Sequence, residues 1–208
     1  MFDNTADQTT PGHYGPSQTA LLLLDFHSIF IQKGGAVDAP AALDVAAKMR
    51  AWSKSQGIRV IHGLIDFDAM PFPTCKGSER IMGFAAATRS GGGGEEPAEL
   101  VEDGGDDFTF TRRPGYVSAL KSAGLGDFLQ KNEIKSLILT GLSTSGCVAR
   151  TALAATDAEY IVTVISDGCA DPKEGVHDIM LGSVLNQMGY VSKASEFQEG
   201  YANTRNGV

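Results

Sequence analysis

The chain has 208 residues, of which 42% are hydrophobic and 20% charged, and its formal net charge is −8 at a sequence pI of about 4.9. This size and composition predict a globular protein with a core of its own. The acidic balance and the lack of a basic stripe argue against a nucleic-acid partner. The apolar runs are too short to cross a bilayer, so we expect no membrane partner either.

The three cysteines, Cys75, Cys147 and Cys169, are widely spaced and contain no C-x-x-C pair. An odd number without a paired framework favours free thiols in a reducing compartment. The first residues, MFDNTADQTTPGHYGPS, have neither the basic nor the apolar region of a secretory signal. We therefore expect a cytoplasmic protein.

Residues 1–18 are polar and rich in Gly, Pro and Thr, which predicts a flexible arm or a segment laid over the surface of a single domain at 19–208. The run TALLLLDF at 19–26 is typical of a strand buried on both faces of a parallel sheet. Residues 39–57 have helical spacing and end at a glycine, and residues 58–66 predict a second strand.

Residues 67–106 have no clear periodicity and contain two glycine-rich stretches. Such a long excursion indicates either a lid over a site or a solvated surface insertion. Further along, the pattern predicts alternating strands and helices. The predicted strands are 107–113, 134–142 and 160–168, with a possible edge strand at 190–198, and the predicted helices are 125–131, 147–157 and 174–189. This alternation predicts an α/β fold: a three-layer, Rossmann-like α/β/α sandwich around a mostly parallel sheet of five to six strands.

In open sheets of this kind, sites form beyond the carboxyl ends of the strands. Asp25, the pair Arg112–Arg113 and Cys147 all follow predicted strands. We therefore expect these side chains to meet at one edge of the sheet.

Cys147 follows the small residues STSG and precedes a predicted helix. The helix dipole and nearby amide groups would lower the pKa of such a thiol, and backbone amides in a small-residue turn suit an oxyanion hole. The alternative is a small apolar side chain that fills space. Asp25 is either a proton acceptor or a cap of the next turn. Arg112 and Arg113 supply positive charge to the site, or pair with the acidic stretch at 102–107.

Together, the ALLLLD strand end, a basic residue before SAL, and TGLSTSGCV followed by TALAA resemble the isochorismatase-like cysteine hydrolases, a superfamily that includes nicotinamidases and N-carbamoyl amino acid amidases. The likeness covers roughly residues 19–195. Its most specific part is G-x-x-T-x-x-C-V, and a D-x-x-x-x-F element runs from Asp25 to Phe30. The first element comprises Gly141, Thr144, Cys147 and Val148.

The resemblance implies an Asp–Lys–Cys triad in which Asp25 takes the thiol proton and Cys147 attacks a carbonyl carbon to form an acyl-enzyme. It also implies a non-proline cis peptide at Leu142–Ser143, an oxyanion hole made by the amides of Ser143 and Cys147, and a pocket lined by Phe30. Tyr116 is a further candidate for the lining. No metal and no cofactor are expected. The resemblance implies a small-molecule substrate and a homodimer or homotetramer.

Two positions depart from the family pattern. Arginine stands where the family has lysine; Arg113 is our first choice for that position and Arg112 our second. Arginine keeps the positive charge but cannot shuttle a proton near neutral pH. His27 replaces a usual glutamine and is either a substrate contact or a packed polar residue.

Three hypotheses follow. The first is a cysteine-dependent hydrolase of a small amide or ureido C–N bond. The second is a vinyl-ether hydrolase in which Asp25 is the acid, and the third is an inactive binding protein on the same fold.

Overall fold

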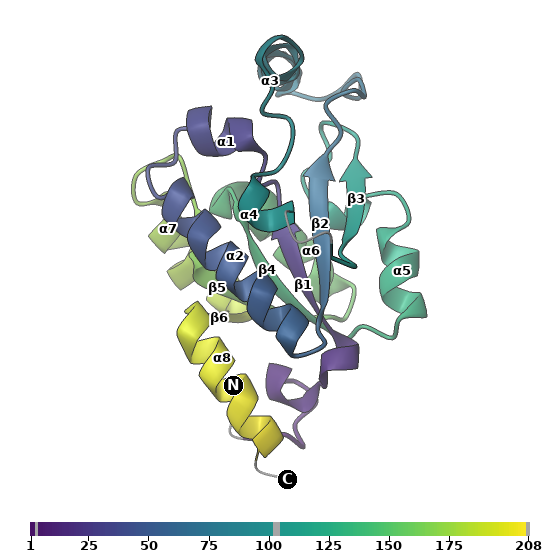
Figure 1. Ribbon diagram of the computed structural model, residues 1–208, viewed down its shortest axis with the longest axis vertical. Coiled ribbons are helices and arrows are strands. Elements are labelled where there is room, and N and C mark those ends of the chain that lie inside the picture. The colour runs from purple at the N-terminus through teal and green to yellow at the C-terminus, as the bar shows by residue number, and fades with distance from the viewer. Residues whose placement is uncertain (3, 102–104, 207–208) are drawn as a thin grey trace.

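The computed structural model describes residues 1–2, 4–101 and 105–206, so small parts of the predicted arm, excursion and domain (3, 102–104 and 207–208) lie outside the described residues. Six strands form one parallel sheet in the order β3-β2-β1-β4-β5-β6 (Figure 1). The strands are β1 (Thr19–Leu24), β2 (Arg59–Ile65), β3 (Phe108–Arg112), β4 (Ser136–Leu142), β5 (Ile161–Ala170) and β6 (Tyr190–Ser192). The predicted parallel α/β fold is confirmed.

The core lies in two layers, one on each face of the sheet. All six residues of β1 are buried, and its leucines alternate between the faces: Leu22 and Leu24 point to one, Leu21 and Leu23 to the other. Helix α2 (Ala39–Ser55), α4 (Ala98–Val101) and α8 (Ala194–Asn206) supply the apolar side chains on the second face. The first face is covered by α5 (Leu125–Lys131) and α6 (Ala149–Asp157). Burial on both faces explains why the leucines of β1 form a continuous apolar run.

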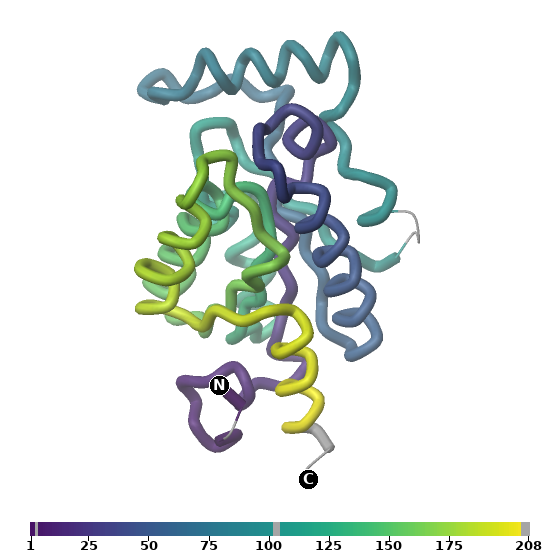
Figure 2. Tube along the Cα trace, turned by 90° about the vertical axis from the view of Figure 1, so that its left-hand side faces the viewer, coloured from purple at the N-terminus to yellow at the C-terminus, as the bar shows by residue number. Residues whose placement is uncertain are grey.

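The N-terminal arm packs on the end of α8 (Figure 2). It forms two short 3-10 turns, Pro11–His13 and Pro16–Gln18. The ring of Phe2 contacts the ring of Phe197 edge-on at 5.3 Å, and Tyr201 lies against the same ring at 6.3 Å. The described residues of the arm therefore make aromatic contacts with α8.

Several of the described helices were not expected from the sequence, among them the short α4 in the excursion at 67–106. Within the excursion read as irregular lies α3 (Ser78–Gly91), which crosses above the carboxyl ends of the strands (Figures 1 and 2). Only Ala85 of α3 is buried, so this helix does not need an apolar stripe and its sequence shows little helical periodicity. Helix α1 (Ser28–Lys33) follows β1 and was also missed.

The C-terminal region differs in two further ways. The predicted edge strand at 190–198 ends after β6, and α8 begins at Ala194 because Phe197 and Tyr201, one helical turn apart, are both fully buried. The predicted helix at 174–189 is broken into α7 (Val176–Ile179), η5 (Met180–Val184) and η6 (Leu185–Gln187). Among the described residues, none of the helices is long and apolar enough to span a membrane.

Candidate active site

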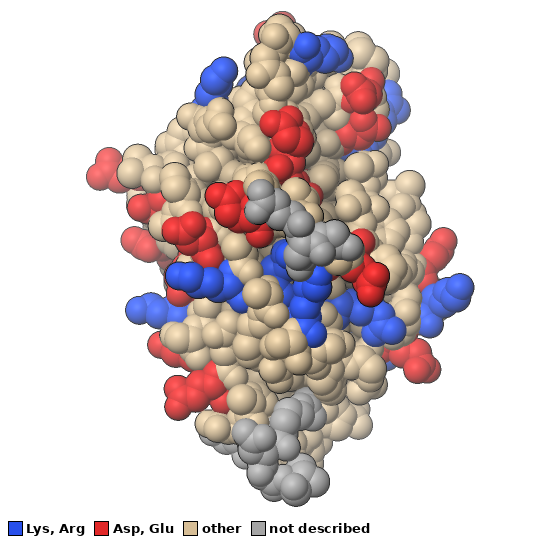
Figure 3. All heavy atoms as spheres, in the orientation of Figure 1, with Lys and Arg blue, Asp and Glu red and all other residues tan. Residues whose placement is uncertain are grey.

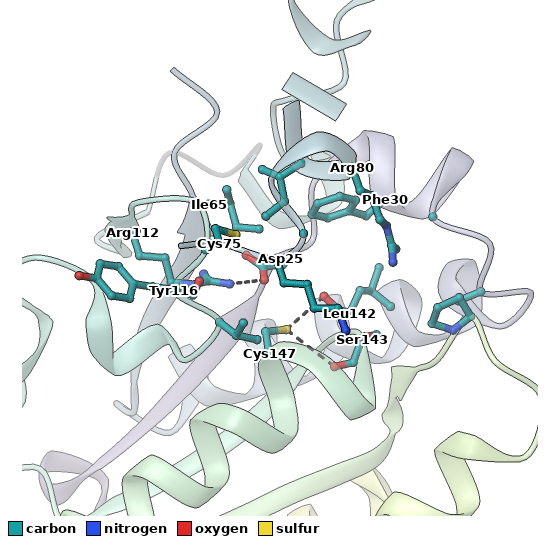
Figure 4. A pocket seen from close by; sticks show the side chains of 18 of the residues that line it. Asp25, Phe30, Ile65, Cys75, Arg80, Arg112, Tyr116, Leu142, Ser143 and Cys147 are labelled. Carbon is teal, nitrogen blue, oxygen red and sulfur yellow. Dashed lines mark hydrogen bonds and ion pairs between the residues drawn. The ribbon is translucent and has the colours of Figure 1, made fainter. Parts of the chain in front are cut away.

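A cavity of about 410 Å³ opens at the carboxyl edge of the sheet, under α3 and the segment before it (Figure 4). This volume suits a small molecule. Its floor comes from strand ends and the turn after β4, and its roof from residues 72–81. The lining residues used below are Asp25, Phe30, Phe72, Cys75, Lys76, Arg80, Arg112, Tyr116, Ser143 and Cys147.

Asp25 follows the last residue of β1 and is 3% exposed. Its φ of 55° lies in the left-handed region, which is costly for a residue with a side chain, and its amide donates to the Gly63 carbonyl at 3.1 Å. Its Oδ2 accepts a hydrogen bond from Arg112. The other oxygen, Oδ1, is buried without a hydrogen-bond partner among the described residues. One carboxylate oxygen is therefore held, and one is left for a proton from elsewhere.

Arg112 ends β3 and is 2% exposed. All three guanidinium nitrogens are used: Nη2 binds Asp25, Nε donates to the Tyr116 carbonyl at 3.0 Å, and Nη1 donates to the Gly63 carbonyl at 3.3 Å. Burial lowers the pKa of Arg112, but the negative charge of Asp25 raises it, and the balance lies above its usual range. The side chain is a fixed cation at the base of the site.

Arg113, our first choice for this position, lies elsewhere. Its Nε donates to the Met70 carbonyl at 2.8 Å and its Nη2 to the Pro71 carbonyl at 3.2 Å, and it is exposed. Successive side chains of an extended chain point to opposite sides, so only one of two neighbouring arginines can face Asp25. The expectation that Arg113 stands beside Asp25 is wrong; Arg112 does.

Cys147 lies in a wide turn, Thr144–Val148, directly before α6, and is 3% exposed. Its Sγ donates to the Leu142 carbonyl at 3.1 Å. Burial raises the pKa of the Cys147 thiol well above its ordinary value, and the Asp25 charge raises it further, while Arg112 opposes this. The expected lowering of this pKa by the helix dipole is therefore wrong, because the thiol is almost fully desolvated. At neutral pH the thiol holds its proton.

The end of β4 packs closely against β1, and the turn that carries Cys147 is tight. A Cβ on Gly141 would lie 2.6 Å from the Leu24 carbonyl oxygen, and one on Gly146 would lie 2.7 Å from the Ser143 Oγ. The Leu142–Ser143 peptide bond is cis. Glycine, which has no side chain, lets the backbone approach its neighbours closely at positions 141 and 146. Ser143 and Cys147 both line the cavity.

Two side chains that the sequence did not single out as site residues fix the outer side of the turn. Asp171, just after β5, accepts a hydrogen bond from the Ser145 amide at 2.7 Å. His177 Nδ1 lies 2.8 Å from the Thr144 Oγ1. Asp171 lies three residues beyond the strand predicted at 160–168, which is a weak signal for a site residue.

Phe30 and Tyr116 line the cavity, but His27 does not. Its Nε2 accepts from the Ile65 amide at 3.2 Å, so its Nδ1 carries the proton and donates to the Gly94 carbonyl at 2.6 Å. Both ring nitrogens are hydrogen-bonded to the backbone, so His27 is a packed polar residue. Its prediction as a substrate contact is wrong. Cys75, Lys76 and Arg80 line the cavity and were missed, because the excursion showed no pattern that places side chains.

A buried charge cluster lies outside the cavity. His62 Nδ1 is 2.8 Å from Glu96 Oε1, and its Nε2 is 3.3 Å from Asp107 Oδ2, which also accepts from Arg50 Nε at 2.6 Å. Burial lowers the pKa of His62, but Glu96 and Asp107 raise it, and the balance lies above 6.5. This cluster joins β2 to the segment after α3. Within the described residues, no group of three or more His, Cys, Asp or Glu side chains is placed to hold a metal ion.

The chain is similar to several known proteins. A model of the isochorismatase domain matches residues 19–196. The nicotinamidase of Escherichia coli (strain K12) is 29% identical over 199 residues, covering 77% of this chain and 89% of its own. The maleamate amidohydrolase of Pseudomonas putida (KT2440) is 24% identical over 175 residues, covering 83% and 81%. The structure of an isochorismatase family protein from Burkholderia thailandensis superposes with a TM-score of 0.72 at 17% identity, covering 89% and 96%.

Proposed function

Because the chain belongs to the isochorismatase family, we propose that it is a cysteine-dependent hydrolase that cleaves the C–N bond of a small amide or ureido substrate through an acyl-enzyme. One observation carries the proposal: Asp25, Arg112 and Cys147 lie together on one wall of the cavity. Two relatives, a nicotinamidase and a maleamate amidohydrolase, are by name amidases, which supports the same bond type.

In the proposed first step, the Cys147 thiol gives its proton to Asp25 as sulfur bonds to the amide carbon, and the carbonyl electron pair moves onto oxygen. Because the pKa of the thiol is raised, attack and proton transfer are coupled rather than preceded by a resting thiolate. When the intermediate collapses, the C–N bond breaks and Asp25 returns the proton to the leaving nitrogen. Water then attacks the thioester with Asp25 again accepting a proton, and the thiol is restored.

Arg112 takes the position of the family lysine in this scheme. Its pKa lies above the usual range, so it does not donate a proton to the reaction. It holds Asp25 Oδ2 and leaves Oδ1 to accept the thiol proton. Its positive charge also favours the anionic intermediate, whose oxygen we assign to the backbone amides of Ser143 and Cys147.

The test is ammonia release from a panel of small amides and ureido compounds. We expect turnover by the wild type and a loss of about a thousandfold or more in Cys147→Ala and in Asp25→Asn. Cys169→Ala is the matched control, because Cys169 is also a buried free thiol but does not line the cavity. Full activity in Cys147→Ala would contradict the proposal.

The same variants separate the other two hypotheses. Vinyl-ether hydrolysis that survives Cys147→Ala but not Asp25→Asn would indicate acid catalysis by Asp25. Binding of a panel member without any turnover would indicate an inactive binding protein. We also propose that the protein forms a homodimer or homotetramer, which light scattering would measure. Its proposed location is the cytoplasm.

A further inference from the structure

The roof of the cavity carries positive charge that the proposed mechanism does not use. Among the described residues that line the cavity, Asp25 is the only acid, and three are basic: Lys76, Arg80 and Arg112. Arg112 is neutralised by its ion pair with Asp25. Lys76 and Arg80 therefore leave the cavity with an excess of positive charge, in a chain whose net charge is −8.

This excess is local. On the face shown in Figure 3, basic side chains run across the middle with acidic ones above and below them, so the two signs are mixed. In the described lining of the cavity, the one acid, Asp25, is paired with Arg112. Most of the remaining lining is apolar and includes Phe30, Ile65, Phe72 and Leu142. Lys76 and Arg80 are exposed residues at the edge of the cavity. The low-dielectric walls beside them focus their field, which raises the local concentration of anions.

Arg80 is held where it can meet a ligand. It lies on α3, and its guanidinium carbon is 5.8 Å from the centre of the Phe84 ring, one helical turn along. Phe84 in turn packs edge-on against Phe30 at 5.0 Å. Figure 4 shows Arg80 descending beside Phe30 on the opposite side of the cavity from Cys147. The reacting carbon and the roof cation would therefore contact different ends of one substrate.

From this arrangement we infer that the substrate is an anionic amide: a small molecule with the scissile amide at one end and a carboxylate at the other, which binds Arg80 and Lys76. The inference rests on the proposed amidase function for the identity of the scissile bond. Arg80 is the specificity-determining residue because a guanidinium binds a carboxylate through two parallel hydrogen bonds, and Lys76 adds charge without that geometry. A neutral aromatic amide would leave both cations without a partner.

The experiment uses monoamides of dicarboxylic acids, namely malonamate, succinamate, maleamate and phthalamate, each paired with its methyl ester. The ester keeps the amide and the carbon frame and removes the charge. We expect ammonia release from the best acid at a kcat/KM about tenfold or more above that of its ester. Arg80→Gln removes this preference by lowering the value for the acid alone, and Lys76→Gln reduces it partly. Arg89→Gln, on the same helix but outside the cavity lining, leaves it unchanged.

A second readout does not depend on turnover. In Cys147→Ala, calorimetry of the same pairs measures binding alone, and we expect the acid to bind more tightly than the ester and added salt to weaken only the acid. If the amidase function fails but this difference persists and is lost in Cys147→Ala/Arg80→Gln, the anionic site stands without the proposed chemistry. If no pair differs in binding or turnover, or if Arg80→Gln weakens acid and ester equally, the inference is overturned.

Discussion

The guanidinium of Arg112 donates a hydrogen bond to Oδ2 of Asp25, while the other oxygen, Oδ1, is buried without a hydrogen-bond partner among the described residues. A buried carboxylate oxygen without a partner is costly, and such groups are concentrated where function requires them. Cys147 shares the same wall of the cavity, and the Asp25 charge raises the pKa of its thiol. In the proposed mechanism, the oxygen that Arg112 leaves unpaired is the one that receives the thiol proton.

Removing Arg112 will cost both stability and activity. In Arg112→Gln, the Asp25 carboxylate is left buried without its partner, and breaking such a pair costs about 3–5 kcal/mol. Arg112→Lys keeps the charge but loses at least part of the fork that reaches Gly63 and Tyr116, so we expect an intermediate loss. Denaturant unfolding and amide turnover measure the two effects. Arg113→Gln is the neighbouring control, and a loss there as large as in Arg112→Gln would refute the assignment.

The charges of Asp25 and Arg112 should change the alkylation rate of the Cys147 thiol in opposite directions. Because burial and the Asp25 charge raise the pKa of the thiol, we expect slow alkylation of Cys147 by iodoacetamide at pH 7, with the half-buried Cys75 labelled first. Asp25→Asn removes a negative charge and should speed labelling of Cys147, whereas Arg112→Gln removes a positive charge and should slow it. Peptide mass spectrometry across pH measures the rates, and labelling that responds to neither variant would contradict this electrostatic account.

His62 will make stability depend on pH. Its folded-state pKa lies above the ordinary 6.5 because Glu96 and Asp107 outweigh the effect of burial. A raised pKa means that the protonated form is stabilised by folding, so the contribution of His62 is fully present below pH 6.5 and is lost as pH rises through the folded-state value. The difference in unfolding free energy between wild type and His62→Gln should therefore shrink from pH 6 to pH 9. A difference that grows over this range would show that the sign is wrong.

Gly141 will not tolerate a side chain. A Cβ there would lie 2.6 Å from the Leu24 carbonyl oxygen, which is backbone and cannot move without shifting β1. We expect Gly141→Ala to cost about 1–3 kcal/mol, the usual range for overpacking, and to lower turnover because Leu24 precedes Asp25. Gly126→Ala in α5 is the control, since a Cβ there meets nothing within 4 Å. Equal melting temperatures for the two variants would contradict the prediction.

Much of the fold was predictable because the parallel strands are buried on both faces. The strands β1 and β4 are buried at every residue and are mostly apolar, so no amphipathic alternation was needed to find them. Helix α3 could not be predicted in this way, because it is exposed and has almost no apolar stripe. In α8, Phe197 and Tyr201 are buried by packing against Phe2 and Trp52, partners that lie far away in the sequence.

The sequence predicted that Asp25, an arginine and Cys147 meet at the carboxyl edge of the sheet, where they line the cavity. It could not resolve the details of their arrangement. Which of two adjacent arginines faces Asp25 depends on the phase of β3 relative to β2, and the letters R-R do not fix that phase. The pKa of Cys147 depends on how much of the turn is desolvated, which is a property of the packed structure. The two basic side chains of the roof come from a segment without periodicity, so only the folded structure brings them to the cavity.

The most direct test of the central claim is to trap the acyl-enzyme. During steady-state turnover of the best amide, an acid quench followed by mass spectrometry should find the acyl group of the substrate on the peptide that contains Cys147. The adduct should be absent from Cys147→Ala, whose turnover should be lost, and present in Cys169→Ala. Turnover that persists in Cys147→Ala, or an adduct on Cys75 or Cys169 in its place, would contradict the account.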